Sequence, residues 1–129
     1  MQVIVYGSEE ISVLSLVEAI HSLAPAAKVE TCAGFSRCEA MLVEAGTGEV
    51  VMVVLVVDRE ELARMFSLRE RFMETPLVLV LPDDSGETVR MGHRLRPRFV
   101  GFFSRGFSDV AAVVARLLAR TCQVSHAGS

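Results

Sequence analysis

A carboxylate and a hydroxyl follow two strand-like segments of this chain, and both groups could help to hold a small ligand. Asp58 directly follows an apolar run at residues 50–57, and Gly7 and Ser8 follow a short β-rich run at residues 2–6. In open α/β folds, ligands bind at the carboxyl ends of parallel strands. Gly7, Ser8 and Asp58 are therefore the first candidates for a binding or enzymatic site.

Other recognisable sites are missing from the sequence. His21, His93 and His126 have no ligand spacing with one another or with the cysteines, so we predict no metal site. The first strand is not followed by a glycine-rich phosphate loop, which argues against dinucleotide binding. No Ser-His-Asp or Cys-His arrangement can be recognised from spacing. We accordingly predict no catalytic residues and no cofactor.

The cysteines and the N-terminal residues indicate the cellular compartment of the protein. Three cysteines without close pairing are typical of reduced thiols in a cytoplasmic protein. We expect two of them to be packing residues, and Cys32 to be a buried thiol rather than a nucleophile. Met1 runs straight into a strand, so we expect no secretion leader. The longest apolar run is far shorter than the about 20 residues of a membrane-spanning helix, so we expect no membrane partner.

Positive charge is concentrated in the last third of the chain. Residues 89–129 carry seven arginines and one acid, a balance of +6, whereas residues 1–88 carry 15 acids and six bases, a balance of −9. Such asymmetry can mark a binding face. We predict a partner-binding face made of Arg90, Arg94, Arg96, Arg98, Arg116 and Arg120. Nucleic acid is not the expected partner, because the whole chain is acidic and aromatic residues are not interleaved with the arginines.

The element that must position the candidate site is the run at residues 50–57, in which six of eight residues are valine. Valine is stiff at its first side-chain torsion and favours strands. The run does not alternate between apolar and polar residues, which indicates a strand that is covered on both faces. We therefore expect it to be the central strand of a parallel sheet, with residues 77–81 as a second buried strand.

The remaining segments alternate between strand and helix patterns. Ser8 is expected to cap the first helix and Asp58 the third, since both residue types are favoured at that position. The expected strands are residues 2–6, 28–32, 50–57, 77–81 and 98–103, and the expected helices are residues 9–23, 36–45, 59–73, 87–95 and 108–121. This alternation predicts a flavodoxin-like doubly wound parallel sheet of five strands in the order 2-1-3-4-5, with helices on both faces. Residues 1–121 form one domain, and residues 122–129 are expected to be a flexible tail or the start of a linker.

Two segments resemble the response-regulator receiver domain. Residues 75–84, TPLVLVLPDD, look like the fourth strand of that family, and residues 100–109, VGFFSRGFSD, look like its fifth strand and the entry to its last helix. The family pattern covers nearly the whole chain, and it is specific from about residue 68 to 119. The resemblance implies a signalling domain in which an aspartate after the third strand accepts a phosphoryl group with the help of magnesium.

Several positions depart from that family pattern. The two magnesium-binding acids would fall near Tyr6 and Gly7, and neither residue is an acid, whereas magnesium requires hard oxygen ligands. Asp58 matches the acceptor only if the following loop is shortened, because an ungapped count places Val53 there. The switch hydroxyl falls on Leu81.

The lysine position of the family falls on Arg105, which keeps the charge but not the compact ammonium group. Gly7, Ser8, Asp58, Leu81 and Arg105 therefore form a possible degenerate phosphoacceptor pocket. We interpret the chain as a non-catalytic, receiver-like signalling module that binds another signalling protein or a second copy of itself, through the helix 4–strand 5–helix 5 face in a homodimer. Two alternatives stay open: a phosphoacceptor receiver that uses Asp58, and a flavodoxin-like domain that binds a small ligand or acts as an enzyme.

Overall fold

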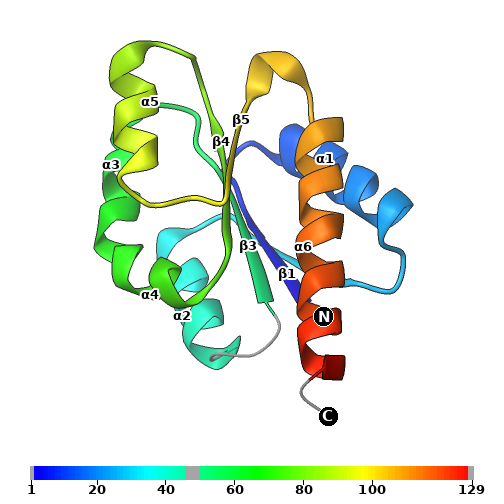
Figure 1. Ribbon diagram of the computed structural model, residues 1–129. Coiled ribbons are helices and arrows are strands. Elements are labelled where there is room, and N and C mark those ends of the chain that lie inside the picture. Colours follow the sequence, from blue (N-terminus) through cyan, green and yellow to red (C-terminus); the bar gives the residue numbers. More distant parts are fainter. Residues whose placement is uncertain (1, 46–49, 128–129) are drawn as a thin grey trace.

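The computed structural model describes residues 2–45 and 50–127, with side chains for residues 2–45 and 50–120. Five parallel strands form one sheet, in the order β2-β1-β3-β4-β5 that the sequence predicts (Figure 1). The strands are β1 (Gln2–Tyr6), β2 (Lys28–Cys32), β3 (Val50–Leu55), β4 (Leu77–Leu81) and β5 (Phe99–Phe102). Because β3 lies in the middle, its carboxyl end is flanked by those of β1 and β4.

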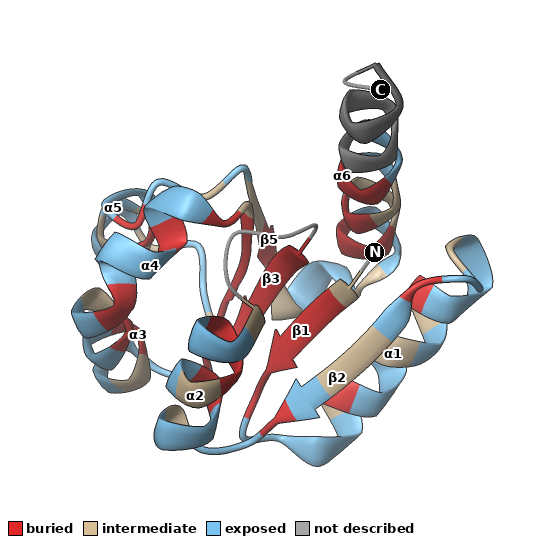
Figure 2. Cartoon of the chain, turned by 90° about the horizontal axis from the view of Figure 1, so that it is seen from below, coloured by how far each residue is buried: buried red, intermediate tan, exposed pale blue. Residues whose placement is uncertain are grey.

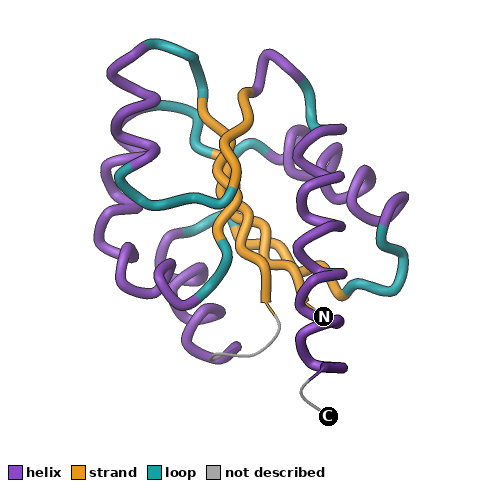
Figure 3. Tube along the Cα trace, in the orientation of Figure 1, coloured by secondary structure: helices purple, strands orange, loops and turns teal. Residues whose placement is uncertain are grey.

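Helices cover both faces of this sheet, and successive strand residues feed two separate cores because side chains alternate between the faces. On one face, α1 (Glu10–Leu23) and α6 (Ser108–Ala127) lie side by side over Val51, Val53 and Leu55. The other face is covered by α2 (Phe35–Ala45), α3 (Arg59–Met65), α4 (Arg69–Glu74) and α5 (Gly86–His93). Figure 3 shows the sheet between these two helical layers.

The central strand is buried throughout, as its valine-rich sequence predicts. All six residues of β3 are buried, and so are all five residues of β4 (Figure 2). The strand is shorter than expected, because Val56 and Val57 lie beyond its end. Val56 nevertheless remains fully buried, and its N–H donates to the Val80 carbonyl at 3.0 Å. Asp58 therefore sits three residues past the end of β3, and not at its end.

Three helices differ from the sequence-based expectation. The helix predicted for residues 59–73 is divided into α3 and α4 by the 3-10 turn η1 (Phe66–Leu68). The helix predicted for residues 87–95 is α5, which begins at Gly86 and ends at His93. The last helix, α6, extends to Ala127, beyond the expected helix end at residue 121. Residues 128–129 and the predicted glycine-rich stop of α2 at residues 46–48 lie outside the described residues.

The expected cap of the first helix is also wrong. Glu9, and not Ser8, is the N-cap of α1, and it makes no side-chain capping bond. The Ser8 hydroxyl instead donates a hydrogen bond to Glu61, on a different helix. The loop after β1 is therefore tied to α3 across the carboxyl edge of the sheet.

Candidate functional site

Glu61 is the centre of the polar cluster at the carboxyl edge of β1 and β3. Its Oε2 accepts hydrogen bonds from the Tyr6 hydroxyl at 3.3 Å and from the Ser8 hydroxyl at 3.2 Å. Its Oε1 accepts from the backbone N–H of Val57 at 3.0 Å. The cluster thus joins the end of β1, the β3–α3 loop and the first turn of α3 through one carboxylate.

Local sequence explains how Glu61 reaches this place. Asp58 is the N-cap of α3, as predicted, and its Oδ1 accepts the N–H of Glu61 at 2.8 Å. In a capping box, the acid three residues after the N-cap reaches back to the N-cap backbone N–H. Here Glu61 reaches one residue further, to the N–H of Val57. Asp58 and Glu61 therefore hold each other at the helix start, and one oxygen of Asp58 is used for capping.

Gly7 permits the close approach of β1 to α1. It is buried, its N–H donates to the Cys32 carbonyl at 3.1 Å, and a Cβ at this position would lie 2.5 Å from Cγ2 of Val13. Only a glycine fits between the strand end and the helix. Gly7 is thus a packing position, and it leaves no room for an acidic side chain there.

The other two predicted pocket residues, Leu81 and Arg105, form no hydrogen bond or ion pair with Glu61 in the described chain. Leu81 is fully buried in the core under α5, where its methyl groups lie 3.2 Å from the Cβ position of Gly92. The guanidinium of Arg105 lies 4.9 Å from the ring centroid of Phe102, a cation–π distance. Within the described chain, Arg105 forms no ion pair with Asp58. Ser8 and Asp58 are therefore joined through Glu61, next to Gly7, whereas Leu81 and Arg105 make other contacts.

Gly106 explains part of the local geometry of Arg105. It ends the short 3-10 turn η2 (Phe103–Arg105) with a φ of 71°. A positive φ of this size favours glycine, since a residue with a side chain would be strained there. Gly106 therefore permits the turn between η2 and the start of α6.

A second polar cluster, which the sequence did not reveal, ties the start of α3 to Ser85, the N-cap of α5, and to the first turn of α5. Arg59 donates to Thr88 Oγ1 at 3.0 Å, to Glu87 Oε2 at 2.9 Å and to Ser85 Oγ at 3.1 Å. Hydrogen bonds from Ser85 and Thr88 lower the pKa of Asp83, and Arg59 contributes its charge. Thr88 is fully buried, so these bonds satisfy a polar group that would otherwise be costly. The start of α5 is thereby bonded to the start of α3.

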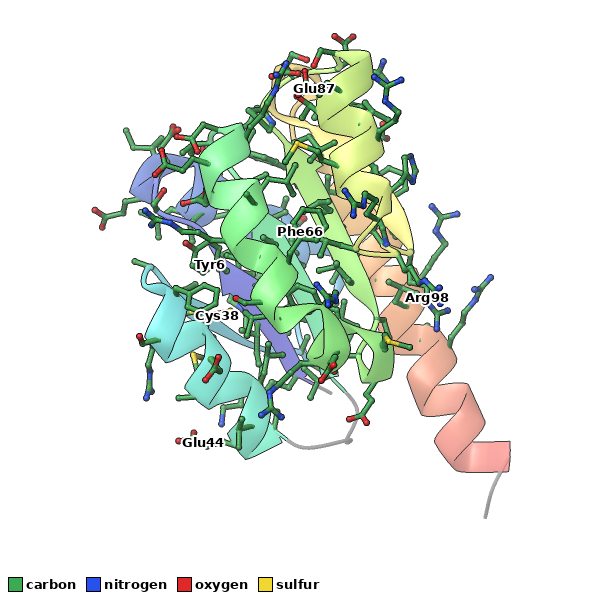
Figure 4. All side chains as sticks on the ribbon, turned by 90° about the vertical axis from the view of Figure 1, so that its left-hand side faces the viewer. Tyr6, Cys38, Glu44, Phe66, Glu87 and Arg98 are labelled. Carbon is green, nitrogen blue, oxygen red and sulfur yellow. The ribbon has the colours of Figure 1, made fainter. Side chains whose placement is uncertain are left out.

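The pKa of Tyr6 is raised to about 12. Burial is the largest cause, followed by the negative charge of Glu61 and then by the hydrogen bond to Glu61. Figure 4 shows Tyr6 on the side of the sheet that α2 and α3 cover. The ionised form is disfavoured because it would place a second negative charge beside Glu61.

We expect this shift to be directly measurable, because the chain contains one tyrosine and no tryptophan. A pH titration of the tyrosinate absorbance should have its midpoint near 12 in the folded protein, against about 10 for an unperturbed tyrosine. Since the folded pKa is the higher one, folding stability should fall as the pH rises from 10 towards 12. Glu61→Gln should lower the midpoint but not restore it fully, because burial remains. An unshifted midpoint in the native protein would contradict this geometry.

The predicted arginine face is divided into separate environments. All six arginines are exposed, and none forms an ion pair with a carboxylate in the part of the chain that the structure describes. Arg94 lies over the Phe66 ring at 5.4 Å. A hollow of about 260 Å³ lies beside the edge strand β5, and it is lined by Arg98, Phe99, Val113, Arg116, Leu117 and Arg120. We call it the β5–α6 groove; Figure 4 shows Arg98 at this edge.

Among the side chains of residues 2–45 and 50–120, no three His, Cys, Asp or Glu residues gather as metal ligands. No helix within residues 2–45 and 50–127 combines the length and the apolar composition needed to cross a bilayer.

Comparisons with known proteins identify the fold. No family model and no curated protein matches the chain. Among solved structures, a signal receiver domain of an HD domain-containing protein from Pseudomonas fluorescens Pf-5 has a TM-score of 0.68 at 8% identity, covering 97% of this chain and 91% of its own. A pilus assembly-related protein from Burkholderia pseudomallei K96243 also has a TM-score of 0.68, at 16% identity, covering 91% and 90%. The chain therefore has a receiver-like fold.

Proposed function

We propose that this chain is a non-catalytic, receiver-like signalling module that acts by protein–protein contact without being phosphorylated. The observation that carries the proposal is the environment of Glu61. Its carboxylate accepts bonds from Tyr6, Ser8 and Val57 in the place where a receiver would need an open acidic pocket. Phosphoryl transfer depends on bound magnesium and well-placed charge. Tyr6 and Gly7 supply no magnesium ligand, and Leu81 and Arg105 supply neither a hydroxyl nor a lysine.

One observation favours a second candidate function, that of a phosphoacceptor receiver. Asp58 is exposed at the carboxyl edge of the sheet, and it lies beside a second acid, Glu61. Two neighbouring carboxylates could in principle attract a divalent cation. The capping role of Asp58 and the three donors around Glu61 weigh against this function, because both carboxylates already have partners within the protein.

Incubation with magnesium and acetyl phosphate separates the two functions. We expect the intact mass of the protein to stay unchanged, because no metal site is formed around Asp58. Asp58→Asn is a suitable control, since asparagine caps helices about as well as aspartate. Stoichiometric addition of a phosphoryl group that is lost in Asp58→Asn would restore the phosphoacceptor function.

For the contact surface, we propose the β5–α6 groove and an acidic protein partner. The groove combines apolar walls, Phe99 and Val113, with three exposed guanidinium groups. Arginine forks suit carboxylates, since they can bind them with two parallel hydrogen bonds. Charge complementarity of this kind also speeds association. A self-complementary dimer is the alternative occupant, and sedimentation equilibrium would detect it.

The groove predicts a charge-reversal effect on binding to an acidic probe. The double variant Arg98→Glu/Arg116→Glu should bind a fluorescent oligoglutamate peptide at least about tenfold more weakly than the unmodified protein, a loss of ~1.4 kcal/mol. The control Arg64→Glu/Arg69→Glu makes the same charge change on exposed residues of α3 and α4. It should have a much smaller effect. Equal losses in the two variants would mean that only net charge matters and that the groove is an ordinary solvated edge.

A further inference from the structure

Two large apolar side chains are exposed next to each other on the outer face of α1. Ile11 is 77% exposed and Leu14 is 54% exposed. Glu18 follows Leu14 by four residues, so it lies on the same face of the helix, one turn further along. A single exposed apolar residue needs no explanation, whereas neighbours on one helix face favour a contact surface.

This face of α1 and the β5–α6 groove belong to opposite edges of the sheet. β2 and β5 are the two edge strands. α1 lies towards the β2 edge, since Glu10 and Val13 line a hollow together with Thr31 of β2; Figure 2 shows α1 beside β2. Neighbouring strands are about 4.8 Å apart, so β2 and β5 are separated by roughly 19 Å. The α1 face and the groove therefore cannot meet within one chain, but they can meet between two copies.

The two regions carry opposite charge. Glu10 and Glu18 are exposed on α1, whereas the groove is lined by the exposed side chains of Arg98, Arg116 and Arg120. None of these five side chains forms an ion pair in the part of the chain that the structure describes. Their charges can therefore pair with those of a partner.

We propose that the α1 face of one copy, which consists of Glu10, Ile11, Leu14 and Glu18, docks into the β5–α6 groove of a second copy. The chain then associates head to tail. This inference rests on the proposed function, since it identifies the acidic partner of the groove as the chain's own α1. The apolar side chains of α1 cover the apolar walls of the groove, and the carboxylates meet guanidinium groups, which suit them as hydrogen-bond donors.

Charge disfavours both two-fold arrangements of the same surfaces. Two grooves that faced each other would bring together the three guanidinium groups of each copy. Two α1 faces that paired would bring together Glu10 and Glu18 of both copies. Like charges placed opposite each other suppress an interface. Of the three pairings, only α1 against the groove joins opposite charges.

A head-to-tail contact has consequences for the size of the assembly and for its dependence on salt. Each assembly keeps a free α1 face at one end and a free groove at the other, so copies continue to add beyond the dimer unless a ring closes. Raising the salt concentration from about 0.1 M to about 1 M shortens the screening length from about 10 Å to about 3 Å. High salt should therefore weaken the association.

Sedimentation equilibrium at increasing protein concentration measures this association in the unmodified chain. We expect the weight-average mass to rise from the monomer value of 14.1 kDa past that of a dimer, and to fall back at high salt. A mass that levels off at twice the monomer value would indicate a two-fold dimer and would overturn the inference.

Two variants that each block one half of the contact provide the decisive test. Ile11→Ser/Leu14→Ser removes the apolar part of the α1 face, and Arg116→Glu/Arg120→Glu reverses the charge of the groove. All four residues are exposed, so both variants should fold normally, which circular dichroism checks. Each variant alone should be monomeric, because every contact needs one intact surface of each kind. An equimolar mixture should form a one-to-one heterodimer and no larger species, since the remaining surface of each partner is blocked.

Matched controls change similar residues outside the contact. Val43→Ser on α2 and Arg64→Glu/Arg69→Glu on α3 and α4 should associate like the unmodified protein. The inference is wrong if the unmodified protein stays monomeric, if either blocked variant dimerises by itself, or if the mixture does not stop at a heterodimer.

Binding of the oligoglutamate peptide separates a failure of this inference from a failure of the proposed function. A protein that stays monomeric but binds the peptide in its groove would have an acidic partner other than its own α1. A protein that neither associates nor binds the peptide would lose the groove as a contact surface altogether.

Discussion

Val54→Asp should leave the chain without a cooperative folded state. Val54 lies in the central strand β3 with no exposed surface, and it packs in the core under α2, α3 and α5. Burying a polar group without a partner costs roughly 2–7 kcal/mol, and the methyl contacts of valine are lost as well. Whole domains are stable by only about 5–15 kcal/mol. Thermal unfolding followed by circular dichroism should show no transition, or one displaced by tens of degrees.

Val43→Asp provides the matched control for this substitution. Val43 lies on α2 with 51% of its surface exposed, so the new carboxylate remains in water. Exposed substitutions of this kind usually change stability by within about 0.5 kcal/mol. A soluble Val54→Asp protein that melts like Val43→Asp would show that β3 is not the buried central strand.

Gly7→Ala should destabilise the fold by about 1–3 kcal/mol through overpacking. The added methyl carbon would stand 2.5 Å from Cγ2 of Val13, whose β-branched side chain has little freedom to turn away. α1 would have to shift away from the end of β1, and the Ser8–Glu61 hydrogen bond would be strained. Urea denaturation should show a lower midpoint with an unchanged slope.

Two further variants separate the clash from a general effect of removing a glycine. Gly86→Ala adds the same methyl group where no atom lies within 4 Å, so it should be neutral or slightly stabilising at the start of α5. Combining Gly7→Ala with Val13→Ala should cost less than the sum of the two single changes, because the smaller Val13 replacement relieves the contact. Strict additivity would mean that Gly7 does not contact Val13 as described.

Much of the fold follows from sequence patterns that reflect burial. The unbroken valine run specified β3, and the two apolar faces of β4 specified its neighbour. Element ends were less predictable. Val56 and Val57 continue the apolar pattern although the strand ends at Leu55, and nothing in the pattern of residues 59–73 marks the 3-10 turn at Phe66. Such ends depend on backbone hydrogen bonds across the sheet, which a one-dimensional pattern does not contain.

The candidate site was predictable where it rests on local capping and unpredictable where it rests on contacts across the sheet. Asp58 was expected to cap α3, and the acid three residues later could have identified Glu61 as its capping-box partner. Nothing in the sequence joins Tyr6 and Ser8 to Glu61, or Arg59 to Thr88, since these pairs are separated by 29 to 55 residues. The prediction that Ser8 caps α1 was wrong for the same reason, because the Ser8 hydroxyl donates to Glu61 on another helix.

The central claim, that this receiver-like chain does not take a phosphoryl group, is tested most directly by an amide spectrum recorded with magnesium and beryllofluoride. Beryllofluoride mimics the phosphoryl group and binds to the aspartate that would accept it. We expect the amides of Ser8, Val57, Asp58 and Arg105 to keep their positions at saturating mimic, because Glu61 already occupies the edge of the sheet. Magnesium-dependent shifts that centre on Asp58 and disappear in Asp58→Asn would contradict the claim.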